Sequence, residues 1–109
     1  IDGSWYVSNF KHNGVDSTAK FSGWVFKFYN DNNTKTSKAY KLGNDTLYGT
    51  WNGDITTYTF TANFNTTPPL PLDKIAGTWL VTSVPSNVKG SFNKLINGAV
   101  VSEMTLTKN

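Results

Sequence analysis

The chain has 109 residues, which is the length of one domain and leaves no room for a second hydrophobic core. Aromatic residues make up 15% of it and charged residues only 16%, and its net charge of +3 is due to lysine alone, without arginine. The absence of cysteine excludes disulfides, thiolate catalysis and cysteine metal sites, and no apolar run approaches the ~18 residues of a membrane-spanning helix.

Alternation of apolar and polar residues predicts strands along most of the chain. The clearest alternation runs from Tyr58 through Phe60 to Phe64, with threonines between the aromatic residues. In chain order, the predicted strands are 4–11, 23–29, 35–42, 46–52, 55–64, 77–84, 87–96 and 99–108. Asparagine and glycine tolerate the positive φ of tight hairpins, so they mark the turns between strands. The predicted turns are Asn13-Gly14, Asn30-Asp31-Asn32-Asn33, Gly43-Asn44-Asp45, Asn52-Gly53 and Asn97-Gly98.

Two connections are longer than the others. Residues 12–22 include a predicted short helical turn from Ser17 to Phe21. Residues 65–76 contain three prolines, which cannot occupy a central strand, so this link crosses the surface or plugs one end. The pattern predicts a single all-β domain over 1–109, an eight-stranded antiparallel up-and-down barrel. An open sandwich of five or six strands is the alternative, and it would leave more strand edges unpaired.

A short motif recurs at strand entries. Residues 1–10 and 75–84 share Ile, Gly, Trp and Val at the same offsets, and Gly49-Thr50-Trp51 repeats the centre of the motif. Glycine permits a bend or a close backbone approach, and a tryptophan two residues later anchors the apolar face of the strand. The motif therefore indicates where strands begin.

These features resemble the lipocalins and related calycin barrels, in particular the small lipocalin-like domains of exported bacterial proteins, many of them lipoproteins. The resemblance spans nearly the whole chain and implies a lipocalin-like barrel. It also implies an exported location (periplasmic, cell-surface or extracellular) and would allow a lipid anchor upstream of Ile1. The resembling segments are Gly3-Ser4-Trp5, the Asn13-Gly14-x-Asp16 loop, Phe21-x-Gly23-Trp24-x-Phe26-x-Phe28, Gly49-Thr50-Trp51, Ile75-x-Gly77-x-Trp79 after the proline-rich link, and Leu106-Thr107-Lys108-Asn109.

In lipocalins a basic residue of the last strand, usually arginine, packs over the tryptophan of the first Gly-x-Trp. Here Lys108 takes that place, and the resemblance implies that it covers Trp5 by a cation–π contact. Trp5, Trp79 and Lys108 are accordingly expected to have structural roles at the barrel ends. The lack of arginine also disfavours a fatty acid held by an arginine clamp, as in fatty-acid-binding relatives.

The aromatic residues carry the functional prediction, which is non-catalytic binding of a small, largely apolar or aromatic ligand in the barrel interior. The same side chains could instead simply fill the barrel. The alternative function is then an exported surface or adhesion module that contacts protein or glycan through its outer face and loops. The volume of a cavity discriminates between the two. The candidate ligand-binding residues are Trp24, Phe26, Phe28, Tyr40, Trp51, Tyr58, Phe60, Phe92 and Met104.

Polar residues give little support to other functions. His12 is the only histidine and has no second metal ligand or evident nucleophile nearby in the sequence. Most aspartates fall in turns, and the alternation points Glu103 outward. We therefore expect no enzymatic activity, catalytic residue, metal site or cofactor. Scattered lysines without arginine also argue against nucleic acid as a partner, and the oligomeric state stays open.

Overall fold

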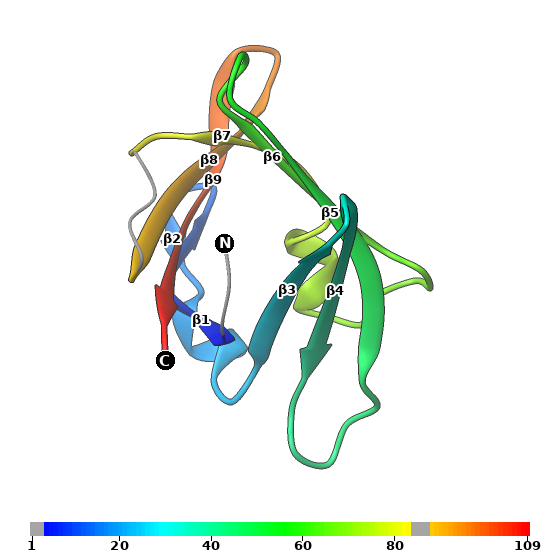
Figure 1. Cartoon of the computed structure of the whole chain (residues 1–109). Helices are drawn as coiled ribbons and strands as arrows, with labels where there is room; N and C mark the ends of the chain where they lie inside the picture. Colours follow the sequence, from blue (N-terminus) through cyan, green and yellow to red (C-terminus); the bar gives the residue numbers. More distant parts are fainter. Residues whose placement is uncertain (1–3, 84–87) are drawn as a thin grey trace.

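The computed structural model describes residues 4–83 and 88–109. Their strands form one continuous antiparallel sheet that closes on itself, because the first long strand pairs with the last. Figure 1 shows the strands wrapped around a common axis, with β6 between the β3–β5 side and the β7–β9 side. The barrel strands are β1 (Ser4–His12), β3 (Val25–Asp31), β4 (Thr34–Tyr40), β5 (Leu47–Asp54), β6 (Thr59–Phe64), β7 (Gly77–Val81), β8 (Lys89–Ile96) and β9 (Ala99–Lys108).

Each barrel strand pairs with its neighbour in chain order, which confirms the predicted eight-stranded up-and-down barrel and excludes the open sandwich. A further short strand, β2 (Val15–Asp16), pairs only with the end of β1. The pairing between β1 and β3 is short, because only Ser4–Lys27 and Trp5–Phe26 are paired.

Asparagine turns join several of the strands as predicted. Asn13, the Asn32-Asn33 pair and Asn97 all have positive φ, and the glycines that follow Asn13 and Asn97 do too. Asparagine and glycine adopt this conformation at little cost, which explains why they close these hairpins.

The turn predicted at Asn52-Gly53 is wrong. Strand β5 runs through both residues to Asp54, and the chain reverses afterwards, over residues 55–58. The side chain of Asp54 explains the position of the turn, because its Oδ1 accepts hydrogen bonds from the backbone amides of Thr56 at 2.8 Å and Thr57 at 3.3 Å. Strand β6 therefore starts at Thr59, four residues later than predicted.

Other boundaries differ by a few residues. Strand β3 begins two residues later than predicted, after Gly23 with its φ of +84°, and β4 ends at Tyr40. Strand β7 ends at Val81, whereas the predicted strand ended at 84. Residue 84, and residue 87 where the next strand was predicted to start, fall outside the described residues. The predicted helical turn is confirmed as the 3-10 helix η1 (Thr18–Phe21).

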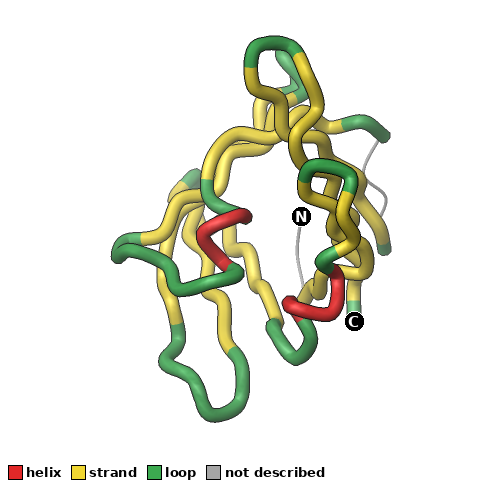
Figure 2. The backbone as a smooth tube through the Cα atoms, turned by 180° about the vertical axis from the view of Figure 1, so that it is seen from behind, coloured by secondary structure: helices red, strands yellow, loops and turns green. Residues whose placement is uncertain are grey.

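The proline-rich link plugs the barrel. It contains a second 3-10 helix, η2 (Leu72–Lys74), whose Leu72 is fully buried in the core together with Ile75. Figure 2 shows η1 and η2, in red, beside the yellow ring of strands. None of the described helices is long and apolar enough to cross a membrane.

Candidate functional site

A pocket of about 650 Å³ opens at one mouth of the barrel. Its walls come from the β3–β4 hairpin, the β5–β6 hairpin, the end of β7 and one residue of β8. This volume lies within the range of small-molecule sites in proteins. The lining residues are Asn30, Lys35, Trp51, Gly53, Asp54, Ile55, Tyr58, Thr59, Phe60, Val81, Thr82, Ser83 and Phe92.

Aromatic rings form the floor of the pocket. The ring centres of Phe60 and Phe92 lie 5.4 Å apart, and those of Trp51 and Phe60 lie 6.1 Å apart with the planes inclined by 30°. Phe28 lies beneath and meets Trp51 and Phe60 edge-on. These spacings are typical of favourable aromatic pairs, so the rings hold one another in place without a ligand.

Trp51 is fixed at the edge of this floor. Its indole Nε1 donates a hydrogen bond to the carbonyl of Tyr29 at 2.9 Å, and the ring is only partly buried. The Nζ atom of Lys35 lies 5.5 Å from the centre of the same ring. Trp51 therefore presents a rigid aromatic face with a positive charge close by.

The rim of the pocket is apolar and exposed. Ile55 is 89% exposed and Tyr58 is 62% exposed, both in the β5–β6 turn. Tyr58 also has a φ of +53°, whereas the other described non-glycine residues with positive φ are all asparagines. Its carbonyl accepts a hydrogen bond from the Val81 amide at 2.7 Å, which ties the turn to the end of β7.

The structure brings some of the predicted ligand residues together and separates others. Trp51, Tyr58, Phe60 and Phe92 line the pocket, and Phe28 supports its floor. Three further predicted interior residues are buried in the packed core, where the described residues leave a gap of only about 10 Å³ beside Phe26 and Phe28. The pocket is therefore at the mouth of the barrel and does not run through its interior. The buried residues away from it are Trp24, Phe26 and Met104.

Tyr40 was predicted to line the interior, and this is wrong. The preceding residue, Ala39, is fully buried and faces inward, so the alternation of β4 places Tyr40 on the outer face. There the Nζ atom of Lys38 lies 5.6 Å from the centre of its ring. The prediction missed several pocket residues altogether, notably Lys35, Ile55 and Val81.

A second hollow of about 600 Å³ lies where β1 and β3 diverge. It is lined by η1 and by both strands, and Trp24 is among its lining residues. Its surface mixes polar and apolar groups and includes no group of aromatic rings in mutual contact like the floor described above. We therefore take the mouth pocket as the candidate site.

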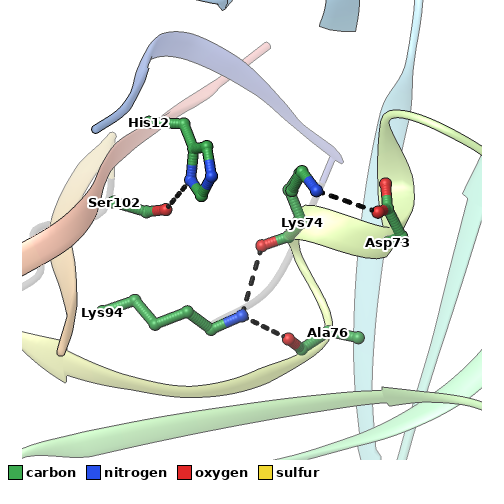
Figure 3. A network of polar contacts seen from close by, with 6 residues as sticks. All are labelled: His12, Asp73, Lys74, Ala76, Lys94 and Ser102. Carbon is green, nitrogen blue, oxygen red and sulfur yellow. Dashed lines mark hydrogen bonds and ion pairs between the residues drawn. The ribbon is translucent and has the colours of Figure 1, made fainter. Parts of the chain in front are cut away.

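The lysine-over-tryptophan arrangement expected at Trp5 occurs at Trp79. Lys94 of β8 places its Nζ 5.0 Å from the Trp79 ring centre and donates hydrogen bonds to the carbonyls of Ala76 at 2.5 Å and Lys74 at 3.4 Å (Figure 3). Burial lowers the pKa of Lys94, and repulsion from Lys74 adds to this effect.

Both tryptophans assigned to the barrel ends are buried. The indole Nε1 of Trp79 donates to the carbonyl of Ile75 at 2.9 Å, which joins the plug to β7. Lys108 lies directly opposite Trp5 in the β1–β9 register, but the lysine itself is exposed.

His12 lies at the other end of the β1–β9 pair, on the side of Lys74 and Lys94, and its Nδ1 is 2.8 Å from the hydroxyl oxygen of Ser102 (Figure 3). Ser102 is only 3% exposed, so its hydroxyl is closed off from a substrate. Among the residues that the structure describes, no three histidine or acidic side chains gather as metal ligands, and Glu103 is exposed as predicted.

No protein-family model matches the chain, and no curated protein sequence matches it. Among solved structures, it is similar to the crystal structure of a DUF4847 family protein from Bacteroides vulgatus ATCC 8482. The TM-score is 0.66 with 18% sequence identity, over 99% of this chain and 93% of the other. At that identity the likeness concerns the fold alone.

Proposed function

We propose that the mouth pocket binds a small, largely apolar or aromatic ligand without changing it chemically. The observation that carries the proposal is the preformed floor of Trp51, Phe60 and Phe92 under a pocket of about 650 Å³. Rings that are already held in position need little ordering when a ligand arrives, and less ordering means stronger binding. A barrel packed to both ends was the premise of the adhesion-module alternative, so an open pocket favours the ligand.

The conformation of Tyr58 supports this function. A bulky residue with positive φ costs free energy that asparagine or glycine would largely avoid. Its side chain is mostly exposed, so packing in the folded protein does not explain the choice of tyrosine. A ligand covering the ring would explain it, since tyrosine offers both an apolar face and a polar tip.

We propose in addition that the protein is a binding protein outside the cytoplasm and not an enzyme. The resemblance to lipocalin-like domains of exported bacterial proteins supports the location. The pocket lining supports the absence of catalysis, because the carboxyl group of Asp54 has no histidine, cysteine or second acid beside it in the lining.

The proposal is tested with the fluorescent probe N-phenyl-1-naphthylamine, a neutral aromatic molecule. The substitution Ile55→Ser removes an apolar side chain from the rim, and Leu42→Ser is the matched control, since Leu42 is fully exposed and outside the lining. Neither change disturbs the core.

We expect saturable binding to the natural chain and to Leu42→Ser with equal affinity. Ile55→Ser should bind about fivefold more weakly, the equivalent of about 1 kcal/mol of lost apolar contact. Absence of saturable binding, or equal affinity of the two serine variants, would overturn the proposal.

A further inference from the structure

We infer that the ligand of the mouth pocket carries a negatively charged group and that Lys35 binds it. This inference rests on the proposed function and narrows it to one class of ligand, the amphipathic organic anion.

Lys35 occupies an inward-facing position on β4. It alternates with Ser37 and Ala39, which are both buried, so its side chain starts on the inner side of the sheet where the barrel opens. The side chain is partly buried and belongs to the pocket lining. A lysine at an inward position is unusual, because most lysines of a barrel lie on its outer face in full contact with water.

The contacts of the ammonium group leave its charge without a counter-ion. Its Nζ donates a hydrogen bond to the neutral side-chain oxygen of Asn52 at 3.1 Å and lies over the ring of Trp51. Within residues 4–83 and 88–109, the ion pair that the structure contains is Lys74–Asp73, at the plugged end. A cation without a counter-ion among the described residues gains from an anionic partner, and here a ligand would supply it.

Asp54 also lines the pocket and carries a carboxylate. Its Oδ1 accepts the backbone amides of Thr56 and Thr57, so this carboxylate is occupied in holding the β5–β6 turn. Two amide donors already satisfy part of its hydrogen-bonding capacity. Asp54 therefore fixes the turn, and Lys35 is the cationic group that the lining presents to a ligand.

The position of Lys35 also defines the shape of the ligand. Its Nζ is 5.5 Å from the Trp51 ring centre, and Phe60 and Phe92 continue the aromatic floor beyond that ring. A flat apolar body on this floor would place a carboxylate or sulfonate on its edge within reach of the ammonium group. Lysine offers a flexible point charge, so it selects for charge more than for the exact geometry of the anion.

The test compares two probes that share their aromatic rings and differ in charge. The anion 1-anilinonaphthalene-8-sulfonate carries a sulfonate, and N-phenyl-1-naphthylamine lacks it. Both are titrated against the natural chain, Lys35→Met and Lys38→Met. The Lys38 variant is the matched control, because it removes the same charge from an outward position on the same strand.

We expect Lys35→Met to weaken binding of the sulfonate probe about tenfold, which corresponds to about 1.4 kcal/mol, and to change binding of the neutral probe by less than about twofold. Lys38→Met should leave both affinities unchanged. Added salt should weaken binding of the sulfonate probe to the natural chain, and it should weaken binding to Lys35→Met less.

Three results would overturn the inference while leaving the proposed function intact, provided that the neutral probe binds the natural chain. The first is equal affinity of the sulfonate probe for the natural chain and Lys35→Met. The second is an equal loss for both probes, which would show that Lys35 acts through packing. The third is the same loss in Lys38→Met, which would show a general effect of net charge. Failure of both probes to bind the natural chain would overturn the proposed function and the inference together.

Discussion

The ammonium group of Lys94 lies 5.0 Å from the centre of the Trp79 ring and donates to the carbonyl of Ala76. One side chain thus joins β8 to the plug and to the start of β7, where direct pairing between β7 and β8 is limited to Leu80–Asn93 and Val81–Phe92. Gly77 lies beside this contact: its φ of +118° favours glycine, and an added Cβ would also lie 3.1 Å from the Lys94 Nζ. The side chain of Lys94 therefore connects β7 and β8 where few backbone hydrogen bonds join the two strands.

Replacing Lys94 should therefore destabilise the barrel. Lys94→Met keeps an unbranched apolar side chain but removes the donors, so the Ala76 carbonyl loses its partner. We expect the free energy of unfolding in urea to fall by about 1–3 kcal/mol. Lys20→Met, at an exposed position, should change it by less than about 0.5 kcal/mol. Equal stability of the two variants would show that the Lys94 contacts contribute nothing.

Gly49 is required by the close approach of two strands. An added Cβ would overlap the carbonyl oxygen of Asn63 on β6, which is backbone and cannot move without breaking the pairing. Gly49→Ala should cost more than about 3 kcal/mol of stability or prevent folding. Gly53→Ala is the control on the same strand, because its Cβ would meet only the Trp51 ring at 3.8 Å, and its midpoint of thermal unfolding should stay within a few degrees. Similar losses in both variants would contradict this explanation.

Strand β2 ends on an acid with a lowered pKa, Asp16. The Thr18 hydroxyl, which donates to the Asp16 Oδ1 at 2.7 Å, is the main cause of the low pKa, the Thr18 amide adds to it, and attraction from Lys11 contributes least. Because folding lowers this pKa, the stabilisation from Asp16 is complete above the ordinary value of 3.8 and is lost as the pH falls through the folded value.

An NMR titration of the Asp16 carboxyl carbon checks that order of causes. Thr18→Val should move the pKa up toward 3.8, and Lys11→Met should move it less. A larger shift from the lysine variant would mean that long-range charge, and not the hydroxyl hydrogen bond, controls this acid.

Tyr58 should separate stability from binding. Tyr58→Asn replaces a strained tyrosine with a residue that tolerates positive φ, so thermal stability should stay equal or rise, while binding of N-phenyl-1-naphthylamine should weaken. Tyr48→Asn is the control, since Tyr48 is similarly exposed at 60% but lies on the outer face of β5, and it should leave binding unchanged. A marked loss of stability in Tyr58→Asn would show that the tyrosine serves the fold.

The barrel could be predicted from the sequence, because the patterns that specify its strands and turns act over a few residues. Asparagine turns at 13–14 and 97–98 and the alternation around Phe60 each have a direct physical cause, so their positions could be predicted. Tyr40 could not be placed, because Ala39 and Tyr40 are adjacent apolar residues and the alternation does not select between them. The turn after Asp54 forms because the Asp54 side chain accepts two backbone amides. The sequence instead pointed to the nearby Asn52-Gly53 pair, which is the more familiar turn signal.

The site was harder to predict than the fold. Phe60 and Phe92 are recognisable as inward aromatic residues, but whether such rings fill a barrel or leave a pocket depends on the position of the surrounding turns. Lys35 and Lys94 look like any other lysine of the sequence, and only the closed barrel places one at its mouth and the other over Trp79. The resemblance to lipocalins implied this arrangement for Trp5 and Lys108, and the structure has it at Trp79, in the second copy of the motif.

The most direct test of the binding site uses the indole N–H resonances of the four tryptophans during titration with N-phenyl-1-naphthylamine. Trp51 lines the mouth pocket, whereas Trp5 and Trp79 are buried at the barrel ends and Trp24 lies beside the hollow between β1 and β3. We predict a saturable shift of the Trp51 resonance, with the other three nearly unchanged. Saturable binding that moves Trp24 most, or leaves Trp51 unmoved, would contradict the assignment of the mouth pocket as the ligand site.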